Sequence, residues 1–89
     1  MSPDEIEAWL ETPDSRRVGS RREGGESVGQ ASGRRIVRLL REGASTEEDY
    51  RHMRKVVGFV RRHRAQEPAN TVTSRWRYSL MNWGHDPLR

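Results

Sequence analysis

The sequence has no cysteine, one lysine and one phenylalanine among its 89 residues. The absence of cysteine excludes a disulfide framework and a thiolate metal site. No apolar run approaches the roughly 20 residues that a membrane span needs. The first residues also lack the apolar centre of a signal peptide. We therefore expect a cytoplasmic chain that does not enter a membrane.

Apolar residues are scarce, because they make up 31% of the chain against 34% charged residues. This is a lean composition for a globular domain. A chain of this length also buries only a little over 60% of the surface that its unfolded form exposes. We expect residues 1–89 to form one small domain. Its core then depends on the three tryptophans, or a second copy of the chain completes it.

Capping signals and apolar spacing predict about four helices and no strands. A capping box at Ser2–Glu5 opens an acidic first helix, which ends at Pro13 within residues 1–13. Residues 14–27 are rich in glycine, serine and arginine without a period, and predict a basic loop. The other helices are expected from Ser27 or Ser32 to Glu42, from about Thr46 (the longest, opened by a capping box at Ser45–Glu48) to Gln66, and from about Ser74 to Asn82. The expected fold class is a small all-α bundle with residues 28–89 as its helical core.

The spacing of apolar residues also predicts the buried face of each helix. In the second helix these residues are Val28, Gly29, Gly33, Ile36, Leu39 and Leu40, and the two glycines would let another helix approach closely. In the third they are Met53, Val56, Val57 and Val60, flanked by Tyr50 and His63. In the last they are Trp76, Leu80 and Trp83.

Charge is distributed unevenly along the chain. Residues 1–14 hold 5 acidic residues and no basic one, which leaves 17 basic and 8 acidic residues in 15–89, a net charge of +9. Such asymmetry indicates a polyanionic partner, or an acidic first helix that covers part of a basic surface. Almost all of the positive charge is arginine, which favours phosphate recognition. The coding composition of the genome is the competing explanation.

The third predicted helix carries a basic side opposite its apolar side. This basic side consists of Arg51, Arg54, Lys55, Arg61 and Arg62, with Gly58 in its middle. Cations spaced along a helix can contact the phosphates on either side of a groove. A glycine there costs helix stability but allows a partner's backbone to come close. A solvated outer face that keeps the protein soluble is the alternative interpretation.

Two further segments are candidates for nucleic-acid contact. Arg16, Arg17, Arg21 and Arg22 could form a basic arm along a nucleic-acid backbone, or merely belong to a surface loop. Near the end of the chain, Arg75, Arg77 and Tyr78 lie off the apolar face and can contact phosphates or bases. The second and third helices could also form a helix-turn-helix unit around Gly43.

Catalytic and metal sites find little support. The spacing of Gly19 and Gly24 matches a phosphate-binding loop, but Gly25 and Glu26 follow where lysine and serine or threonine are required. The three histidines, His52, His63 and His85, lack the spacing of metal ligands. No cysteine nucleophile exists and no serine lies in a recognisable elbow. We expect the chain to have no enzymatic activity and to bind no metal and no cofactor.

Three segments resemble a small bacterial and fungal family, domain-of-unknown-function family 3140. They are Arg75-Trp76-Arg77-Tyr78-Ser79-Leu80-Met81-Asn82-Trp83-Gly84-His85-Asp86-Pro87-Leu88, the stretch from Glu26 to Val37, and His52-Met53-Arg54-Lys55-Val56-Val57. The chain departs from the family at Gln30-Ala31, where His-Glu is expected, and at Arg64, where the family has leucine. The resemblance implies no catalytic residues. Some members are labelled DNA-binding, and fungal members often adjoin a small Tudor-like domain.

Two hypotheses about function follow from the residues. In the first, the chain is a non-enzymatic protein that binds nucleic acid, DNA before RNA, through phosphate contacts of the third helix. In the second, it is a small protein–protein interaction module or homodimeric adaptor. The contact would then be made by the acidic first helix, a seam at Gly29 and Gly33, and aromatics such as Trp9 and Tyr78.

Overall fold

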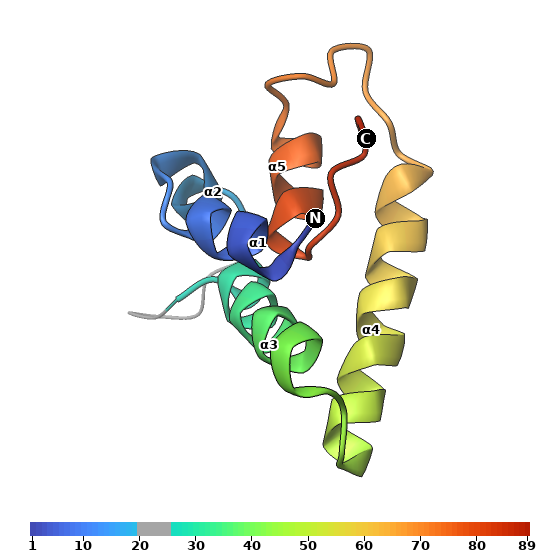
Figure 1. Cartoon of the computed structure of the whole chain (residues 1–89). Coiled ribbons are helices and arrows are strands. Elements are labelled where there is room, and N and C mark those ends of the chain that lie inside the picture. Colours follow the sequence, from blue (N-terminus) through green and yellow to red (C-terminus); the bar gives the residue numbers. More distant parts are fainter. Residues whose placement is uncertain (20–25) are drawn as a thin grey trace.

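The computed structural model describes residues 1–19 and 26–89, and it is an all-α bundle, as the sequence predicts. The described residues form five helices and no strand: α1 (Pro3–Leu10), α2 (Pro13–Arg17), α3 (Val28–Glu42), α4 (Glu47–Arg64) and α5 (Arg75–Asn82). Helices α1, α3 and α5 pack together, and α2 lies against α1 and α5. The longest helix, α4, stands to one side and contacts mainly α5 (Figure 1).

Side-chain caps set where the helices begin. The hydroxyls of Ser2, Ser27, Thr46 and Ser74 each accept a hydrogen bond from the backbone amide three residues later. These contacts satisfy amides that have no partner within the helix. The capping box predicted at Ser2 is confirmed. The box predicted at Ser45 and Glu48 is wrong by one residue, because Thr46 and Asp49 form it.

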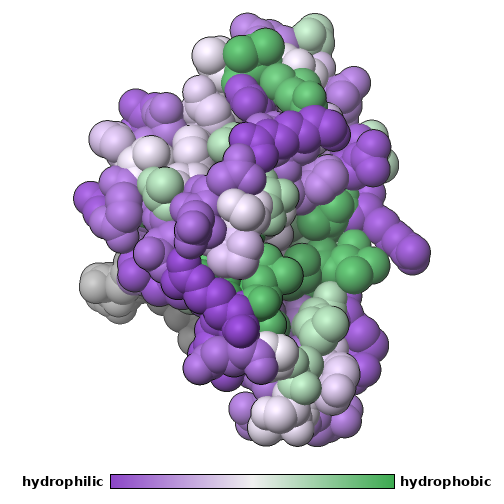
Figure 2. Space-filling model, viewed as in Figure 1, coloured by the Kyte–Doolittle hydropathy of each residue, from purple (hydrophilic) through white to green (hydrophobic). Residues whose placement is uncertain are grey.

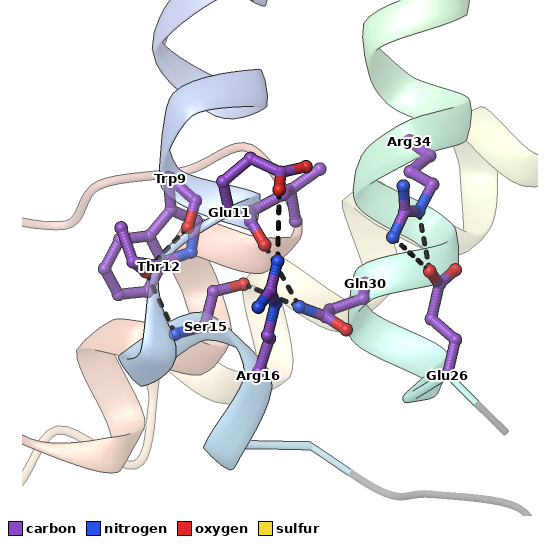
Figure 3. A network of polar contacts seen from close by, with 9 residues as sticks. Trp9, Glu11, Thr12, Ser15, Arg16, Glu26, Gln30 and Arg34 are labelled. Atoms are coloured by element: carbon purple, nitrogen blue, oxygen red, sulfur yellow. Dashed lines mark hydrogen bonds and ion pairs between the residues drawn. The ribbon is translucent and has the colours of Figure 1, made fainter. Parts of the chain in front are cut away.

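Helix α2 was not expected, because residues 14–27 have no apolar period. Thr12 caps it by accepting from the amide of Ser15 at 3.2 Å, while its own hydroxyl donates to the Trp9 carbonyl at 2.7 Å (Figure 3). Pro13 occupies the first helical position, where its missing N–H costs nothing. Pro13 therefore ends α1 and also begins a new short helix.

The apolar core is small and lies between α1, α3 and α5. Ile6, Leu10 and Val37 form its centre, and Leu80 and Trp83 of the α5 region are also buried. Of the three tryptophans, only Trp83 is buried, while Trp9 and Trp76 are partly exposed. The predicted dependence of the core on all three tryptophans is therefore only partly correct.

A polar network at the end of α5 supplements this core. Asn82 is fully buried, and its Oδ1 accepts hydrogen bonds from Trp9 Nε1 at 2.7 Å and from Ser15 Oγ at 2.5 Å. Its Nδ2 donates to the Ser15 carbonyl at 3.1 Å. One amide side chain thus joins α1, α2 and α5. Every polar atom of that side chain is paired, as a buried amide requires.

The two glycines of α3 allow α5 to approach closely. A Cβ atom on Gly33 would lie 2.5 Å from the carbonyl oxygen of Asn82 and 2.8 Å from Leu10. A Cβ atom on Gly29 would lie 3.2 Å from the Asn82 side chain. The predicted close approach is confirmed, but the partner is α5 of the same chain. The seam at Gly29 and Gly33 is therefore not open to a second molecule.

Candidate nucleic-acid interface

Aromatic contacts fix which side of α4 faces the rest of the protein. Phe59 stacks on Trp83 with ring centroids 4.2 Å apart, and His52 stacks on the same ring at 6.2 Å. The indole N–H of Trp76 donates to the carbonyl of His63. His52 also hydrogen-bonds Ser32 of α3 at 2.9 Å. Residues 52, 59 and 63 therefore define the inward side of α4.

This orientation corrects the predicted apolar face of α4. Val56 and Val60 are partly buried, but Met53 is 45% exposed and Val57 is 51% exposed. The inward side is centred on Phe59, His52 and His63. Because the helix faces the protein with this side, Met53 and Val57 of the predicted apolar face point toward solvent. Leu40, predicted to be buried in α3, is also 55% exposed. Hydrophobic atoms accordingly lie at the surface beside and along α4 (Figure 2).

The basic side of α4 is exposed to solvent and largely unpaired. Among the described residues, the cations that form no ion pair with a described acid are confined to α4 and the first turn of α5. They are Arg51, Lys55, Arg61, Arg62, Arg64 and Arg75, and all six are exposed. Arg54 has one pair, an exposed contact of 3.3 Å with Glu47. Such an exposed pair is worth little and leaves Arg54 available.

The arginines of α3 differ, because each has an acidic partner. Arg41 contacts Asp4 at 2.8 Å and Glu7 at 2.7 Å, so the acidic first helix covers part of the basic surface, as one interpretation of the charge pattern predicts. Arg34 pairs with Glu26, as Figure 3 shows. Arg35 and Arg38 both contact Asp49. Each arginine of α3 thus has an acidic neighbour in the chain, and the acid that Arg35 and Arg38 share, Asp49, is buried.

Asp49 joins the start of α4 to α3, and sequence reasoning missed this role. Its carboxylate is buried, accepts from the amides of Ser45 and Thr46 at 3.1 and 3.3 Å, and contacts Arg38 at 3.0 Å. The hydrogen bond from the Ser45 backbone amide and the one from the Arg38 guanidinium hold the pKa of Asp49 well below its usual range. Asp49 therefore remains charged and links the start of α4 to α3 through Arg38.

Two of the predicted contact residues near the chain end have structural partners. Arg77 contacts Asp86 at 3.0 Å and donates to the Val72 carbonyl at 2.8 Å, and the Asp86 hydrogen bond raises the pKa of Arg77. Tyr78 packs on Trp9 with ring centroids 5.2 Å apart. Arg77 and Tyr78 are therefore weaker candidates for contact than Arg75, which is exposed and has no ion pair with a described acid.

The predicted basic arm is only partly within the described residues. Arg16 pairs with Glu11 at 3.0 Å (Figure 3), and Arg17 pairs with Asp14. Both lie on α2, away from α4 (Figure 1). Arg21 and Arg22 lie outside the described residues. The arginines of α2 are therefore weaker candidates than those of α4.

Gly58 lies in the middle of the basic side of α4, as predicted. A Cβ atom there would come within 3.1 Å of the Arg62 guanidinium, whose flexible side chain can move aside. No backbone of the described chain requires a glycine at this position. Arg64, at the end of the same helix, is a further exposed cation that the sequence reasoning left out. Its position in the sequence, directly after Arg61, Arg62 and His63, could have identified it as part of the same basic segment.

No helix among the described residues is long and apolar enough to cross a membrane. No curated protein and no solved structure matches the chain. A family model described as "Protein of unknown function (DUF3140)" matches residues 1–81. This range includes α1 to α4 and most of α5. Since the match covers nearly the whole chain, the protein belongs to this family, DUF3140.

Proposed function

We propose that the chain is a cytoplasmic, non-enzymatic protein that binds nucleic acid, with DNA as the first candidate and RNA as the second. The observation that carries the proposal is the separation of paired and unpaired cations. Every arginine of α3 has an acidic partner in the chain, whereas Arg54 is the only cation of α4 with one among the described residues. Unpaired cations on one exposed helix are suited to phosphate contacts.

The shape of α4 supports extended rather than single-point contact. Its 18 residues give a rod of about 27 Å. Like charges at neighbouring helical positions, such as Arg51 and Lys55, repel each other and weaken the helix slightly. A polyanion removes this repulsion when it binds. Each neutralised phosphate also releases counterions, which is the main source of non-specific affinity.

Reversing two of the unpaired charges tests the proposal. We expect Arg51→Glu with Arg61→Glu to lower the affinity for a labelled duplex at low salt by more than about tenfold. The slope of log affinity against log salt should also fall by about 2, because two phosphate contacts are lost. Fluorescence anisotropy measures both quantities, and circular dichroism checks that the variant still folds.

The matched control carries the same change of charge on α2. Arg16→Glu with Arg17→Glu alters the net charge equally, but replaces arginines that pair with Glu11 and Asp14. We expect this variant to bind with only a small loss of affinity. Equal losses in the two variants would mean that net charge alone matters, and would contradict an interface on α4.

The exposed apolar residues of α4 favour a second candidate function, self-association. Tyr50, Met53 and Val57 are each about half exposed and follow one another at helical spacing. An antiparallel pair of α4 helices would place Met53 of one copy opposite Val57 of the other. Glu47 at the acidic start of one helix would then lie near Arg61 at the basic end of the other. The apolar contact and the charges are therefore both compatible with a homodimer.

Sedimentation velocity tests self-association. We expect the wild-type chain to sediment as a dimer at high protein concentration, and Met53→Glu to sediment as a monomer, because a charge would be buried in the apolar contact. Val72→Glu is the control, since Val72 is 56% exposed but lies outside α4. A wild-type chain that stays monomeric would exclude this candidate.

A further inference from the structure

A pocket of about 520 Å³ lies between the first turn of α3, the second half of α4 and α5. Val28, Phe59 and Trp83 give it apolar walls, and Lys55, Arg62 and Arg75 line it with positive charge. Lys55 and Arg62 come from α4, whereas Arg75 belongs to α5. The pocket therefore lies where α4 adjoins the body of the protein.

The charge of this pocket is of one sign. None of its described lining residues is an aspartate or a glutamate, and its three cations have no ion pair with a described acid. Burial and the nearby Arg62 lower the pKa of His63, which also lines the pocket and is therefore neutral at pH 7. Positive charge beside an apolar wall favours a ligand that is an anion with a flat or apolar body.

The volume of the pocket limits the size of this ligand. Pockets of about 300–1,000 Å³ hold compact organic ligands. A single nucleotide fits that description, since its phosphate can face the positively charged lining while its sugar and base lie against the apolar walls. A duplex presents phosphates but keeps its bases stacked inside. Placing one of its bases in a pocket requires flipping, which costs a few kcal/mol.

A second pocket continues the first along α4. It has a volume of about 330 Å³ and shares Val28, Lys55 and Trp83 with its neighbour. It adds the ring of His52 and Arg35, which is paired with Asp49, and Glu26 also lines it. The two pockets together form a groove in which the unpaired cations Lys55, Arg62 and Arg75 lie beside rings that stack on one another, those of His52, Phe59 and Trp83. Proteins that bind single strands combine these same two features.

We propose that this groove binds unpaired nucleotides, so that the preferred ligand is a single strand rather than a duplex. The inference rests on the proposed function and specifies the form of nucleic acid. The two sets of cations then have different roles. Lys55, Arg62 and Arg75 lie at the pocket, while Arg51 and Arg61 do not line it and contact phosphates of either form.

The test compares a labelled oligothymidylate with a duplex of equal length at the same salt concentration, by fluorescence anisotropy. We expect the single strand to bind tighter by on the order of tenfold, as one base held against the apolar wall of the pocket would give. Arg62→Gln with Arg75→Gln should lower affinity for the single strand more than for the duplex. The control, Arg51→Gln with Arg61→Gln, removes the same charge and should lower affinity for both forms equally.

The outcomes separate the inference from the proposed function. If the duplex binds as tightly as the single strand, or if Arg62→Gln with Arg75→Gln affects both forms equally, the pocket does not hold nucleotides. Binding through α4 would still stand in that case. If neither form binds even at low salt, both the inference and the proposed function are wrong.

Discussion

Replacing Asn82 by alanine should lower the free energy of unfolding by about 3 kcal/mol or more. The change removes the acceptor of Trp9 Nε1 and Ser15 Oγ and the donor to the Ser15 carbonyl. Each buried polar group left without a partner costs about 1–3 kcal/mol. For a domain of this length the loss corresponds to a fall in Tm of roughly 12–24 °C.

Thermal unfolding followed by circular dichroism measures this effect. Asn70→Ala is the matched control, because Asn70 is exposed in the linker before α5. Exposed substitutions usually change stability by no more than about 0.5 kcal/mol. A Tm of the Asn82 variant within a few degrees of the control would show that the buried amide does not join α1, α2 and α5 as described.

Replacing Gly33 by alanine is expected to destabilise the protein by a net free energy of about 1 kcal/mol, although alanine is the better helix former. The new methyl group would meet the backbone carbonyl of Asn82 and the side chain of Leu10, so α5 would have to move away from α3. Overpacking of this kind typically costs about 1–3 kcal/mol. The cost exceeds the roughly 1 kcal/mol that alanine contributes through helix propensity.

Gly58→Ala provides the opposite case within the same chain. Only the end of the Arg62 side chain lies near the new methyl group, so alanine should stabilise α4 by about 1 kcal/mol. Equilibrium unfolding in urea therefore should place the two variants on opposite sides of the wild-type midpoint. A Gly33→Ala variant as stable as the wild type would mean that α3 and α5 are not in close contact.

Most helix starts could be predicted from sequence to within a few residues because caps are local signals. Ser2, Ser27, Thr46 and Ser74 lie where hydroxyl side chains can accept from an amide three residues on, and each begins a helix. Helix α2 could not be predicted in this way. A single turn that begins at Pro13 has no apolar period, and its stability comes from contacts with α1 and α5.

The orientation of α4 shows the limit of periodicity arguments. Met53, Val56, Val57 and Val60 share one side, and counting apolar residues selects that side as buried. The stacking of Phe59 on Trp83 instead turns the helix toward its aromatic side. The sequence does not contain this information locally, since Phe59 and Trp83 are far apart in the chain and meet only where α4 packs against α5.

The location of the candidate interface could be predicted from the sequence, but the residues that remain without an acidic partner could not. The charge pattern identifies the basic side of α4, and those residues are indeed exposed. Sequence alone does not reveal which arginines are neutralised by distant acids. Arg38 meets Asp49 and Arg77 meets Asp86 only after folding. The unpaired set on α4 is what remains once these pairs are known.

The most direct test of nucleic-acid binding through α4 is the salt dependence of affinity of the wild-type chain for a labelled oligonucleotide. If the basic side contacts about five phosphates, log affinity should fall with log salt at a slope near −4 to −5 for a duplex. Measurable affinity at low salt with this slope is the predicted result. Absence of binding at low salt, or binding that salt does not weaken, would contradict it.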